Sequence, residues 1–235
     1  MPLAAPRDAR ARVGIYERTV AGRFQYQVDS ALPSLAETPR GGQLSDTGIR
    51  QRLAGSKQCA TAVNPEIRPF RSADTAAIIG LFRQFMTELT PPHLREEFGH
   101  YVETAVQTEL SRIGEYYFGA PGQGFWVAET EHVIGMVGVE RLSNSQAELR
   151  RMAVDAAFRR RGIARRLLQV AEAFCRDSGY ESIVLSTSEL QVAAMRLYEA
   201  SGYRSIGTET ATAQSHKTVG AGVVRRHYEK SLRRA

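Results

Sequence analysis

The sequence predicts a mixed α/β domain over residues 65–235, in which a central sheet is flanked by helices. Short β-like runs alternate with stripes of apolar residues at helical spacing, a pattern typical of strands and helices that share one domain. The chain is 43% hydrophobic, which is enough for one core. A basic, glycine-containing loop at residues 159–165 joins one predicted strand to one predicted helix.

Residues 1–64 differ in composition from the rest of the chain. They are rich in Arg, Ser, Thr, Gly and Pro, and their few apolar residues follow no period. Such a segment buries too little apolar surface to offset the entropy of ordering it. We therefore predict a disordered N-terminal tail here and assign it no chemistry.

The first predicted elements of the domain are a strand and two helices. Residues 65–70 form a short extended run, and Ser72 or Asp74 is expected to cap a helix that ends before residues 91–92, which are both proline. A second apolar stripe over residues 94–113 predicts one continuous helix. Both stripes are expected to face the core.

The remaining predicted elements are mostly strands. Two β-like runs at 122–129 and 132–142 predict a hairpin. A strand at 148–154 then leads through the basic loop into a helix that ends near Gly179. The last elements are expected as a strand at 181–186, a helix at 190–201, a strand at 203–207 and a strand at 223–232.

The basic loop has the chemistry of an anion site. The first N–H groups of a helix have no intrahelical partner and lie at the positive end of its dipole. Gly162 and the small Ala164 let an anion approach this backbone closely. We expect guanidinium groups around the loop to pair with phosphate; these belong to arginines 150, 151, 159, 160, 161, 165 and 166. The loop predicts a phosphorylated ligand, but it has neither a G-x-G-x-x-G nor a Walker pattern.

The positive charge of the chain is concentrated in two places. Residues 1–64 carry nine basic and five acidic residues, which leaves only +2 of the net charge of +6 for the remainder. In that remainder the arginines cluster at the loop. We therefore interpret the charge as local attraction of an anionic cofactor and do not expect nucleic-acid binding.

Cysteine content and hydropathy set further expectations. Two cysteines, Cys59 and Cys175, cannot form a disulfide framework, and no Cys/His cluster has the spacing of a zinc site, so we expect no metal and a reducing cytoplasm. No apolar run approaches the ~18 residues of a membrane span. The first residues lack the pattern of a signal peptide. We predict a soluble, cytoplasmic protein with no membrane partner.

Two motifs resemble signatures of the GCN5-related N-acetyltransferase (GNAT) family. The run R-x-x-G-x-A at 159–164 follows V-D-x-x-F and is similar to the acetyl-CoA loop of that family. The run A-x-x-L-Y-x-x-x-G-Y at 194–203 is similar to its second signature, at the expected distance. The resemblance covers residues 65–235 and implies the GNAT acyl-CoA N-acyltransferase fold.

A narrower resemblance is to the camello-type N-acetyltransferases. It rests on FWVAE at 125–129, GMVGV at 135–139, the segment 184–191 and His227-Tyr228. Gln191 fits that branch better than the wider family, which often has Asn at this place. The branch includes enzymes that acetylate aspartate or cysteine conjugates, but residues 75–113 carry too many charges to match the long membrane-embedded segment of its animal members.

The resemblance implies a set of residues that hold acetyl-CoA. The loop is expected to bind the pyrophosphate through backbone N–H groups, and the strand before it to pair with the pantetheine and acetyl group through its backbone alone. The residues assigned to the cofactor are Met152, Ala153, Val154, Arg159, Arg160, Arg161, Gly162, Ile163, Ala164, Arg165 and Gln191. Arg160 or Arg161 alone is expected to matter modestly.

Two residues are expected to move protons. Tyr198 stands where the family places its general acid, although an aromatic at helical spacing is usually part of a core. Glu148 has the spacing from Val154 at which a histone-acetylating branch keeps its base. Alternation puts Glu148, Arg150, Met152 and Val154 on one face of the strand as long as no bulge intervenes. Glu140 is a competing base, and a structural pairing of Glu148 with Arg150 or Arg151 is the alternative.

The function implied is transfer of an acetyl group from acetyl-CoA to a primary amine, by direct attack in a ternary complex. The expected acceptor is a small molecule such as an amino acid or conjugate. A protein N-terminus or lysine remains an alternative, as does a non-catalytic acyl-CoA sensor on the same fold. The identity of the acceptor and the oligomeric state, monomer or homodimer, stay open.

Overall fold

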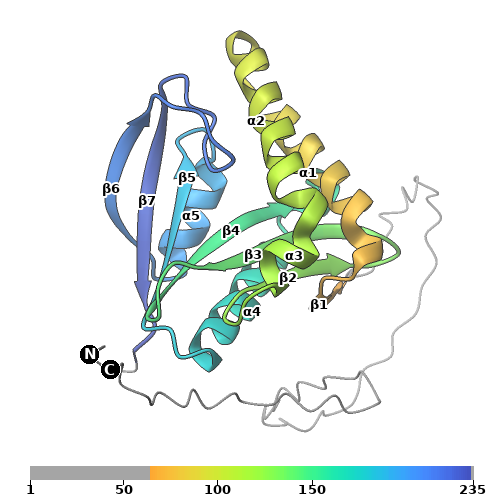
Figure 1. Cartoon of the computed structure of the whole chain (residues 1–235), viewed down its shortest axis with the longest axis vertical. Coiled ribbons are helices and arrows are strands. Elements are labelled where there is room, and N and C mark those ends of the chain that lie inside the picture. Colours follow the sequence, from red (N-terminus) through yellow and green to blue (C-terminus); the bar gives the residue numbers. More distant parts are fainter. Residues whose placement is uncertain (1–63, 234–235) are drawn as a thin grey trace, which may run out of the picture. The chain divides into compact units, whose positions relative to one another are not determined.

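A computed structural model describes residues 64–233, so the tail predicted over 1–64 lies outside the described residues except for Asn64. A single seven-stranded sheet with the order β1-β2-β3-β4-β5-β7-β6 forms the centre (Figure 1). Its strands are β1 (Glu66–Pro69), β2 (Gly124–Glu129), β3 (Val133–Arg141), β4 (Gln146–Val154), β5 (Ser182–Ser188), β6 (Arg204–Ala211) and β7 (Val223–Ser231). Only β4 and β5 pair in parallel, so the predicted mixed sheet is confirmed.

Helices cover both faces of the sheet. The helices α1 (Thr75–Leu89), α2 (Arg95–Thr108) and α3 (Ile113–Phe118) pack on one face, where Phe82, Phe98 and Tyr117 belong to the same buried cluster as Phe125 of β2. On the other face lie α4 (Ile163–Asp177) and α5 (Val192–Ala200). The apolar stripes seen in the sequence therefore face the core, as predicted.

The prediction of one continuous helix over residues 94–113 is wrong. The helix α2 ends at Thr108, and a 3₁₀ turn over Leu110–Arg112 leads into α3. Glu109 stands at the break with φ −133° and ψ −61°, and its side chain is fully buried between two arginines of β4. The non-helical backbone of Glu109 ends α2 and turns its carboxylate toward the arginines of β4.

The Ser72 or Asp74 cap predicted for α1 takes another form. Asp74 precedes α1 without a side-chain hydrogen bond to it. Its carboxylate instead accepts two hydrogen bonds from Arg68 of β1, at 2.7 and 2.9 Å, and Arg68 also bonds Glu129 at the end of β2. This buried ion cluster ties the first strand to the turn that begins α1.

A β-bulge in β4 decides which side chains face which helices. Met136 of β3 pairs with Ala153, whereas Gly138 pairs with Arg150, so β4 has one extra residue at this point. Arg151 lies in the bulge with a φ of +54°. A bulge places two residues of one strand opposite one residue of its partner and so changes the alternation of side chains.

The predicted shared face of β4 therefore ends at the bulge. Glu148 and Arg150 point toward the α2 face, and Arg151 joins them there. Met152 and Val154 instead pack in the cluster of α4 and α5. The expectation that all four even-numbered residues share a face is wrong beyond Arg150.

The parallel pair β4 and β5 separates soon after it begins. Only three residues of each strand pair, ending at Glu148 with Val184, although β4 continues to Val154 and β5 to Ser188. Backbone groups of residues 149–154 that point toward β5 therefore have no strand partner there. The sheet opens at this place.

Candidate active site

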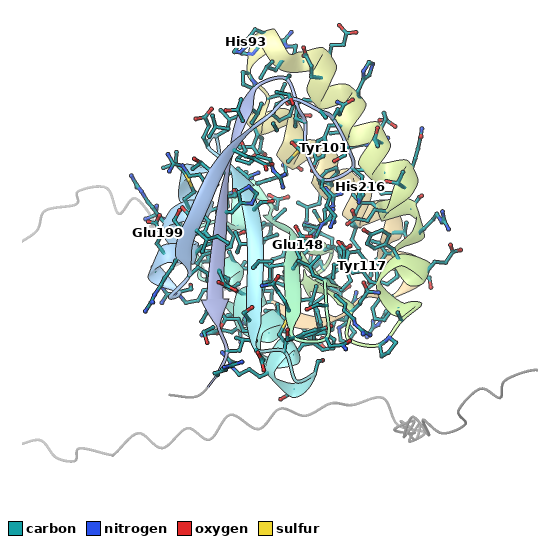
Figure 2. All side chains as sticks on the ribbon, turned by 60° about the vertical axis from the view of Figure 1, so that its left-hand side comes forward. His93, Tyr101, Tyr117, Glu148, Glu199 and His216 are labelled. Atoms are coloured by element: carbon teal, nitrogen blue, oxygen red, sulfur yellow. The ribbon has the colours of Figure 1, made fainter. Side chains whose placement is uncertain are left out.

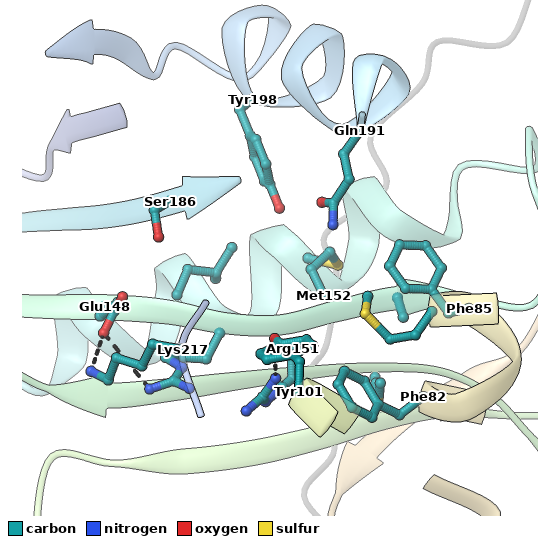
Figure 3. A pocket seen from close by; sticks show the side chains of 15 residues that line it. Phe82, Phe85, Tyr101, Glu148, Arg151, Met152, Ser186, Gln191, Tyr198 and Lys217 are labelled. Carbon is teal, nitrogen blue, oxygen red and sulfur yellow. Dashed lines mark hydrogen bonds and ion pairs between the residues drawn. The ribbon is translucent and has the colours of Figure 1, made fainter. Parts of the chain in front are cut away.

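The opening between β4 and β5 contains a cleft. Its walls come from β4, from Ser186 of β5, from Gln191 and Tyr198 near α5, and from α1 and α2 (Figure 3). The lining residues are Phe82, Phe85, Met86, Tyr101, Met136, Glu148, Leu149, Arg150, Arg151, Met152, Ala153, Ser186, Gln191, Tyr198 and Lys217. Predicted site residues from β4 and α5 are thus brought together around one space.

The loop from β4 to α4 presents free backbone donors. Gly162 is the residue before α4 and has a φ of +78°, a left-handed conformation that glycine adopts without strain. The backbone N–H groups of residues 160–165 donate no hydrogen bond to any other described residue, and the first intrahelical bond is that of Arg166 to the Gly162 carbonyl. Six consecutive donors at a helix N-terminus can hold a pyrophosphate.

The arginines of this region divide into two groups. Arg160, Arg161 and Arg165 are exposed around the loop. Arg159 is already engaged, since its Nε donates to the Val154 carbonyl at 2.9 Å and its guanidinium pairs with Glu88. The side chain of Arg159 therefore fixes the loop against β4 and α1.

The inclusion of Arg150 and Arg151 among the arginines around the loop is wrong. Both side chains are about 5% exposed and bind Glu109 on the α2 face of β4. A guanidinium that already neutralises a buried carboxylate is not available to a phosphate.

Tyr198 points into the cleft from α5 (Figure 3). Its ring packs against Tyr203 and Tyr228, with centroids 5.8 and 6.2 Å away. Burial raises the pKa of Tyr198 above its ordinary value, at which a phenol is already protonated at neutral pH. The position of the ring agrees with both interpretations, since it lines the cleft and also packs in the core. A neutral phenol at a cleft can donate a proton.

Gln191 and Met152 line the cleft near Tyr198. The Gln191 side chain accepts a hydrogen bond from Thr187 at 2.7 Å, which fixes it between β5 and α5. Met152 is half-buried just after the bulge. Ala153 points to the opposite face, and the Val154 carbonyl is taken by Arg159. The backbone around Met152 is thus the part of β4 that is open to a ligand.

A buried charge network lies beside the cleft on the α2 face and contacts Tyr101, Tyr117 and His216, which are labelled in Figure 2. Glu109 accepts from Arg150 at 2.9 Å, from Arg151 at 2.6 Å and from the Tyr117 hydroxyl. Burial acts to raise the pKa of Glu109, but the hydrogen bonds and charges of Arg151 and Arg150 outweigh it, so the pKa is lowered. Arg151 also donates to the Tyr101 hydroxyl at 2.8 Å.

The two predicted bases share one partner. The Nζ of Lys217 lies 2.7 Å from Glu148 and 3.0 Å from Glu140. Glu140 also binds Arg150 at 2.6 Å, whereas Glu148 is 4.0 Å from Arg150. Burial acts to raise the pKa of Glu140, but Arg150 and Lys217 outweigh it and lower the pKa. Glu140 is therefore a weaker base than an ordinary glutamate.

The loop between β6 and β7 closes this side of the cleft. The His216 carbonyl accepts from Arg151 at 2.8 Å, and the Gln214 amide donates to the Glu97 carbonyl of α2 at 2.7 Å. Burial and the charge of Arg150 lower the pKa of His216. These contacts hold Lys217 above the paired end of β4.

A second cavity adjoins the first. It shares Met86, Tyr101, Ser186, Gln191 and Lys217 with the cleft and continues between α1, α2 and the β6–β7 loop. Its other lining residues are Leu89, Phe98, Thr187, Ser188, Leu190, Thr218, Val219, Val223 and Arg225. The two cavities together form one space with both apolar and polar walls, and Lys217 and Arg225 are among its cations.

A model of the acetyltransferase (GNAT) family matches residues 83–203, which is half of the chain and includes both motifs, Tyr198 and most residues that line the cleft. The chain belongs to this family. The prediction made from the two motifs is therefore confirmed.

Curated relatives carry more specific names than the family does. Human N-acetyltransferase 8 is 35% identical over 119 residues, which are 48% of this chain and 52% of that protein. N-acetylaspartate synthetase of Xenopus tropicalis is 39% identical over 110 residues, or 46% of this chain and 41% of that protein. The chain thus spans about half the length of the curated relatives that it matches.

Solved GNAT structures share the fold. A GNAT acetyltransferase of Staphylococcus aureus Mu50 has a TM-score of 0.58 and 22% identity, over 72% of this chain and all of that one. The yncA protein of Salmonella typhimurium, solved with acetyl-CoA, has a TM-score of 0.56 and 17% identity, over 72% of this chain and 95% of that one. At these identities the likeness concerns the fold.

Three other findings describe this GNAT domain. Within residues 64–233 no helix combines the length and the apolar character that a membrane span requires. In the same range no three His, Cys, Asp or Glu side chains are grouped to hold a metal ion. Cys175 is buried, which raises the pKa of its thiol to about 12 and makes it a poor nucleophile.

Sequence reasoning missed several residues of this GNAT cleft. Lys217, Tyr101 and Arg225 line it or its neighbour, but none belongs to a motif. Glu109 was expected only as part of a helix. One signal for Lys217 was present, since lysine is rare in this sequence.

Proposed function

We propose that this chain transfers the acetyl group of acetyl-CoA to a primary amine of a small molecule. Two observations carry the proposal: the cleft at the β4–β5 opening, which Tyr198 and Glu148 line, and the free N–H donors of residues 160–165 in the loop that follows β4. Membership of the GNAT family supports the same reaction. The domain that performs it is proposed as residues 65–235.

In the proposed reaction the protein holds acetyl-CoA through its backbone. The N–H groups of residues 160–165 bind the pyrophosphate, assisted by the exposed Arg160, Arg161 and Arg165. The open backbone near Met152 binds the pantetheine and the thioester. Holding both substrates in one cleft replaces a bimolecular encounter by a local one.

Two side chains are proposed to handle protons. Glu148, directly or through water, takes a proton from the ammonium group of the acceptor. Tyr198, whose neutral phenol lines the cleft, returns a proton to the leaving thiolate. The amine attacks the thioester carbon, the C–S bond breaks, and the products are an amide and free CoA.

The acceptor is proposed to be an amino acid or an amino acid conjugate. The second cavity offers apolar contacts from Phe98 and Val219, and N–H donors from Lys217 and Arg225, which also pair with Glu148 and Glu209. This combination fits a carboxylate that carries an apolar or uncharged group. The names of the relatives, N-acetylaspartate synthetase among them, favour the same class.

Release of free CoA thiol by the full chain tests the function. The panel contains amino acids, cysteine conjugates, polyamines and peptides, each with acetyl-CoA, and binding of acetyl-CoA is measured separately. We expect release with amino acids or conjugates only. Release with peptides only would favour the protein acetyltransferase alternative. Binding of acetyl-CoA without release by any acceptor would favour the sensor.

The remaining predictions from the sequence stay predictions. A cytoplasmic location and a homodimer are untested, as is the tail over residues 1–64. The remaining alternative is a nucleic-acid-binding protein that uses the arginines of the loop. Such a protein would lose affinity for nucleic acid steeply as the salt concentration rises, and acetyl-CoA would compete with the nucleic acid.

A further inference from the structure

Lysine is rare in this chain and one of its lysines lies in the cleft. The sequence contains 28 arginines but only three lysines, at positions 57, 217 and 230. Arginine stays charged at any physiological pH, whereas lysine can lose its proton and become a nucleophile. Among the cations that line the two cavities, which are Arg150, Arg151, Lys217 and Arg225, Lys217 alone has this chemistry.

Lys217 stands where the two cavities meet. It lines both of them, together with Tyr101 and Gln191. Its Nζ is 2.7 Å from Glu148, the carboxylate proposed to accept a proton from the acceptor amine. Figure 3 shows Lys217 and Glu148 against the same strand that carries Met152. The ammonium group of Lys217 is therefore paired with the same carboxylate that is proposed to deprotonate the amine of a bound acceptor.

We propose that Lys217 is an acetyl acceptor of this same site, so that the protein acetylates itself. The inference rests on the proposed acetyl transfer. Lys217 is carried by the β6–β7 loop, which His216 and Gln214 fasten to Arg151 and Glu97. The loop thus supplies a tethered primary amine at a high effective concentration.

The self-acetylation step balances without an added reactant. The Lys217 ammonium gives one proton to Glu148 or to water, and its neutral Nζ attacks the thioester carbon of acetyl-CoA. An N–C bond forms and the C–S bond breaks, with the electron pair leaving on sulfur. The sulfur takes a proton, the nitrogen loses its second proton, and the products are Nε-acetyl-Lys217, CoA thiol and one released proton.

Self-acetylation would change the loop as well as the lysine. An acetylated Nζ carries no charge, so the ion pairs with Glu148 and Glu140 are lost. The two carboxylates then keep only Arg150 as a cationic neighbour among the described residues. The acetyl group would also occupy space at the junction of the cavities, so acetylation closes the site to other amines.

Lys230 provides an internal control. It pairs with Glu172 at 2.7 Å, and its side chain is 21% exposed against 30% for Lys217, so the two ammonium groups are similarly placed with respect to water. Lys230 lines neither cavity. Uncatalysed acetylation by acetyl-CoA would modify both lysines, whereas the cleft would modify Lys217 alone.

The test incubates the full chain with acetyl-CoA that carries an isotopically heavy acetyl group. Trypsin does not cleave after acetyl-lysine, so modified chains yield one uncut peptide over residues 205–225. We expect this peptide to gain the mass of one heavy acetyl group, at a rate per molecule that does not depend on protein concentration. Lys217→Arg should abolish the signal, whereas Lys230→Arg should leave it unchanged.

Failure of this inference is distinguishable from failure of the proposed function. Thiol release with an amino acid acceptor, combined with an unmodified Lys217, would overturn self-acetylation and leave the function intact. Equal modification of Lys217 and Lys230 would also overturn it. A rate of Lys217 acetylation per molecule that rises with protein concentration would show transfer between molecules. That result would overturn acetylation of Lys217 within its own molecule.

Discussion

At the scale of single residues, two tyrosines of similar burial differ in what they face. Tyr198 and Tyr203 pack against one another with ring centroids 5.8 Å apart, but only Tyr198 lines the cleft. The hydroxyl of Tyr198 is therefore open to a ligand. Substitution by phenylalanine removes one oxygen from either ring and keeps its packing, so the two positions make a matched pair.

We predict that Tyr198→Phe lowers kcat by at least ~10²-fold, the usual effect of removing a general acid. The dissociation constant of acetyl-CoA should change little, since the loop at 160–165 is untouched. Tyr203→Phe should keep turnover near that of the unmodified chain. Steady-state kinetics with equilibrium binding checks this, and equal turnover of both variants would remove Tyr198 from the mechanism.

The choice between Glu148 and Glu140 can be made by their pH profiles. Arg150 and Lys217 hold the pKa of Glu140 below its ordinary value, so Glu140 is a poor proton acceptor. We predict that Glu148→Gln removes the acidic limb of the pH–rate profile, whereas Glu140→Gln keeps it. An acidic limb that persists without Glu148 would mean that water or another group is the base.

At the scale of elements, α4 has a left-handed glycine just beyond each end. Gly162 has φ +78° and Gly179 has φ +82°, and a Cβ on either would contact nothing within 4 Å. Alanine at either position costs about 1 kcal/mol of backbone strain. The two ends differ because only Gly162 belongs to the loop with free N–H donors.

We predict that Gly162→Ala and Gly179→Ala lower the free energy of unfolding by similar amounts, about 1 kcal/mol each. Only Gly162→Ala should weaken acetyl-CoA binding, because the strain distorts the donors at 160–165. Urea unfolding and calorimetric titration measure the two effects. A loss of affinity in both variants would indicate a general effect of α4 and not a site in the loop.

The break between α2 and α3 places the carboxylate of Glu109 beside Arg150 and Arg151. Glu109 neutralises Arg150 and Arg151, so Glu109→Gln leaves two buried guanidinium groups without a full counter-charge. We predict a loss of about 3–5 kcal/mol of unfolding free energy. Glu115→Gln is the control, since its pair with Arg112 is exposed and should contribute little. Urea unfolding at neutral pH compares the two.

The same carboxylate predicts an acid transition. Its pKa in the folded protein lies below the unfolded value of about 4.5, so its contribution is fully present above that pH and is lost as the pH falls through the folded-state pKa. Unfolding free energy measured against pH should therefore fall below about pH 4.5 in the unmodified chain and fall less in Glu109→Gln. Parallel curves would mean that other carboxylates control acid unfolding.

The elements were predictable to different degrees for physical reasons. Period and turn chemistry located the hairpin, β4, α4 and β7, because each has a regular apolar pattern bounded by Gly, Pro or polar residues. The break at Glu109 and the bulge at Arg151 were not predictable, since both depend on contacts between residues 40 positions apart or more. Motifs located the loop and Tyr198, whereas Lys217 reaches the cleft only through the path of the β6–β7 loop.

At the scale of the whole molecule, a ligand in the opening would complete the sheet. Acetyl-CoA bound there would contact β4, the loop before α4 and the region of α5. A ligand at ~100 times its dissociation constant stabilises by about 2.7 kcal/mol. We predict a raised thermal midpoint, with hydrogen exchange slowed at residues 149–154 and 160–165. Protection spread evenly over β1 and β6 would mean that acetyl-CoA binds elsewhere.

The short parallel contact between β4 and β5 also has a mechanical consequence. Antiparallel ladders of four to seven residue pairs join the other neighbouring strands, but only three pairs join β4 to β5. A force that pulls the edge strands β1 and β6 apart must act through the β4–β5 contact. Two contacts of the β6–β7 loop reinforce it: the ion pair of Lys217 with Glu148 and the hydrogen bond of Gln214 with Glu97. The sheet would therefore separate first between β4 and β5, and the β6–β7 loop holds the two parts of the sheet together.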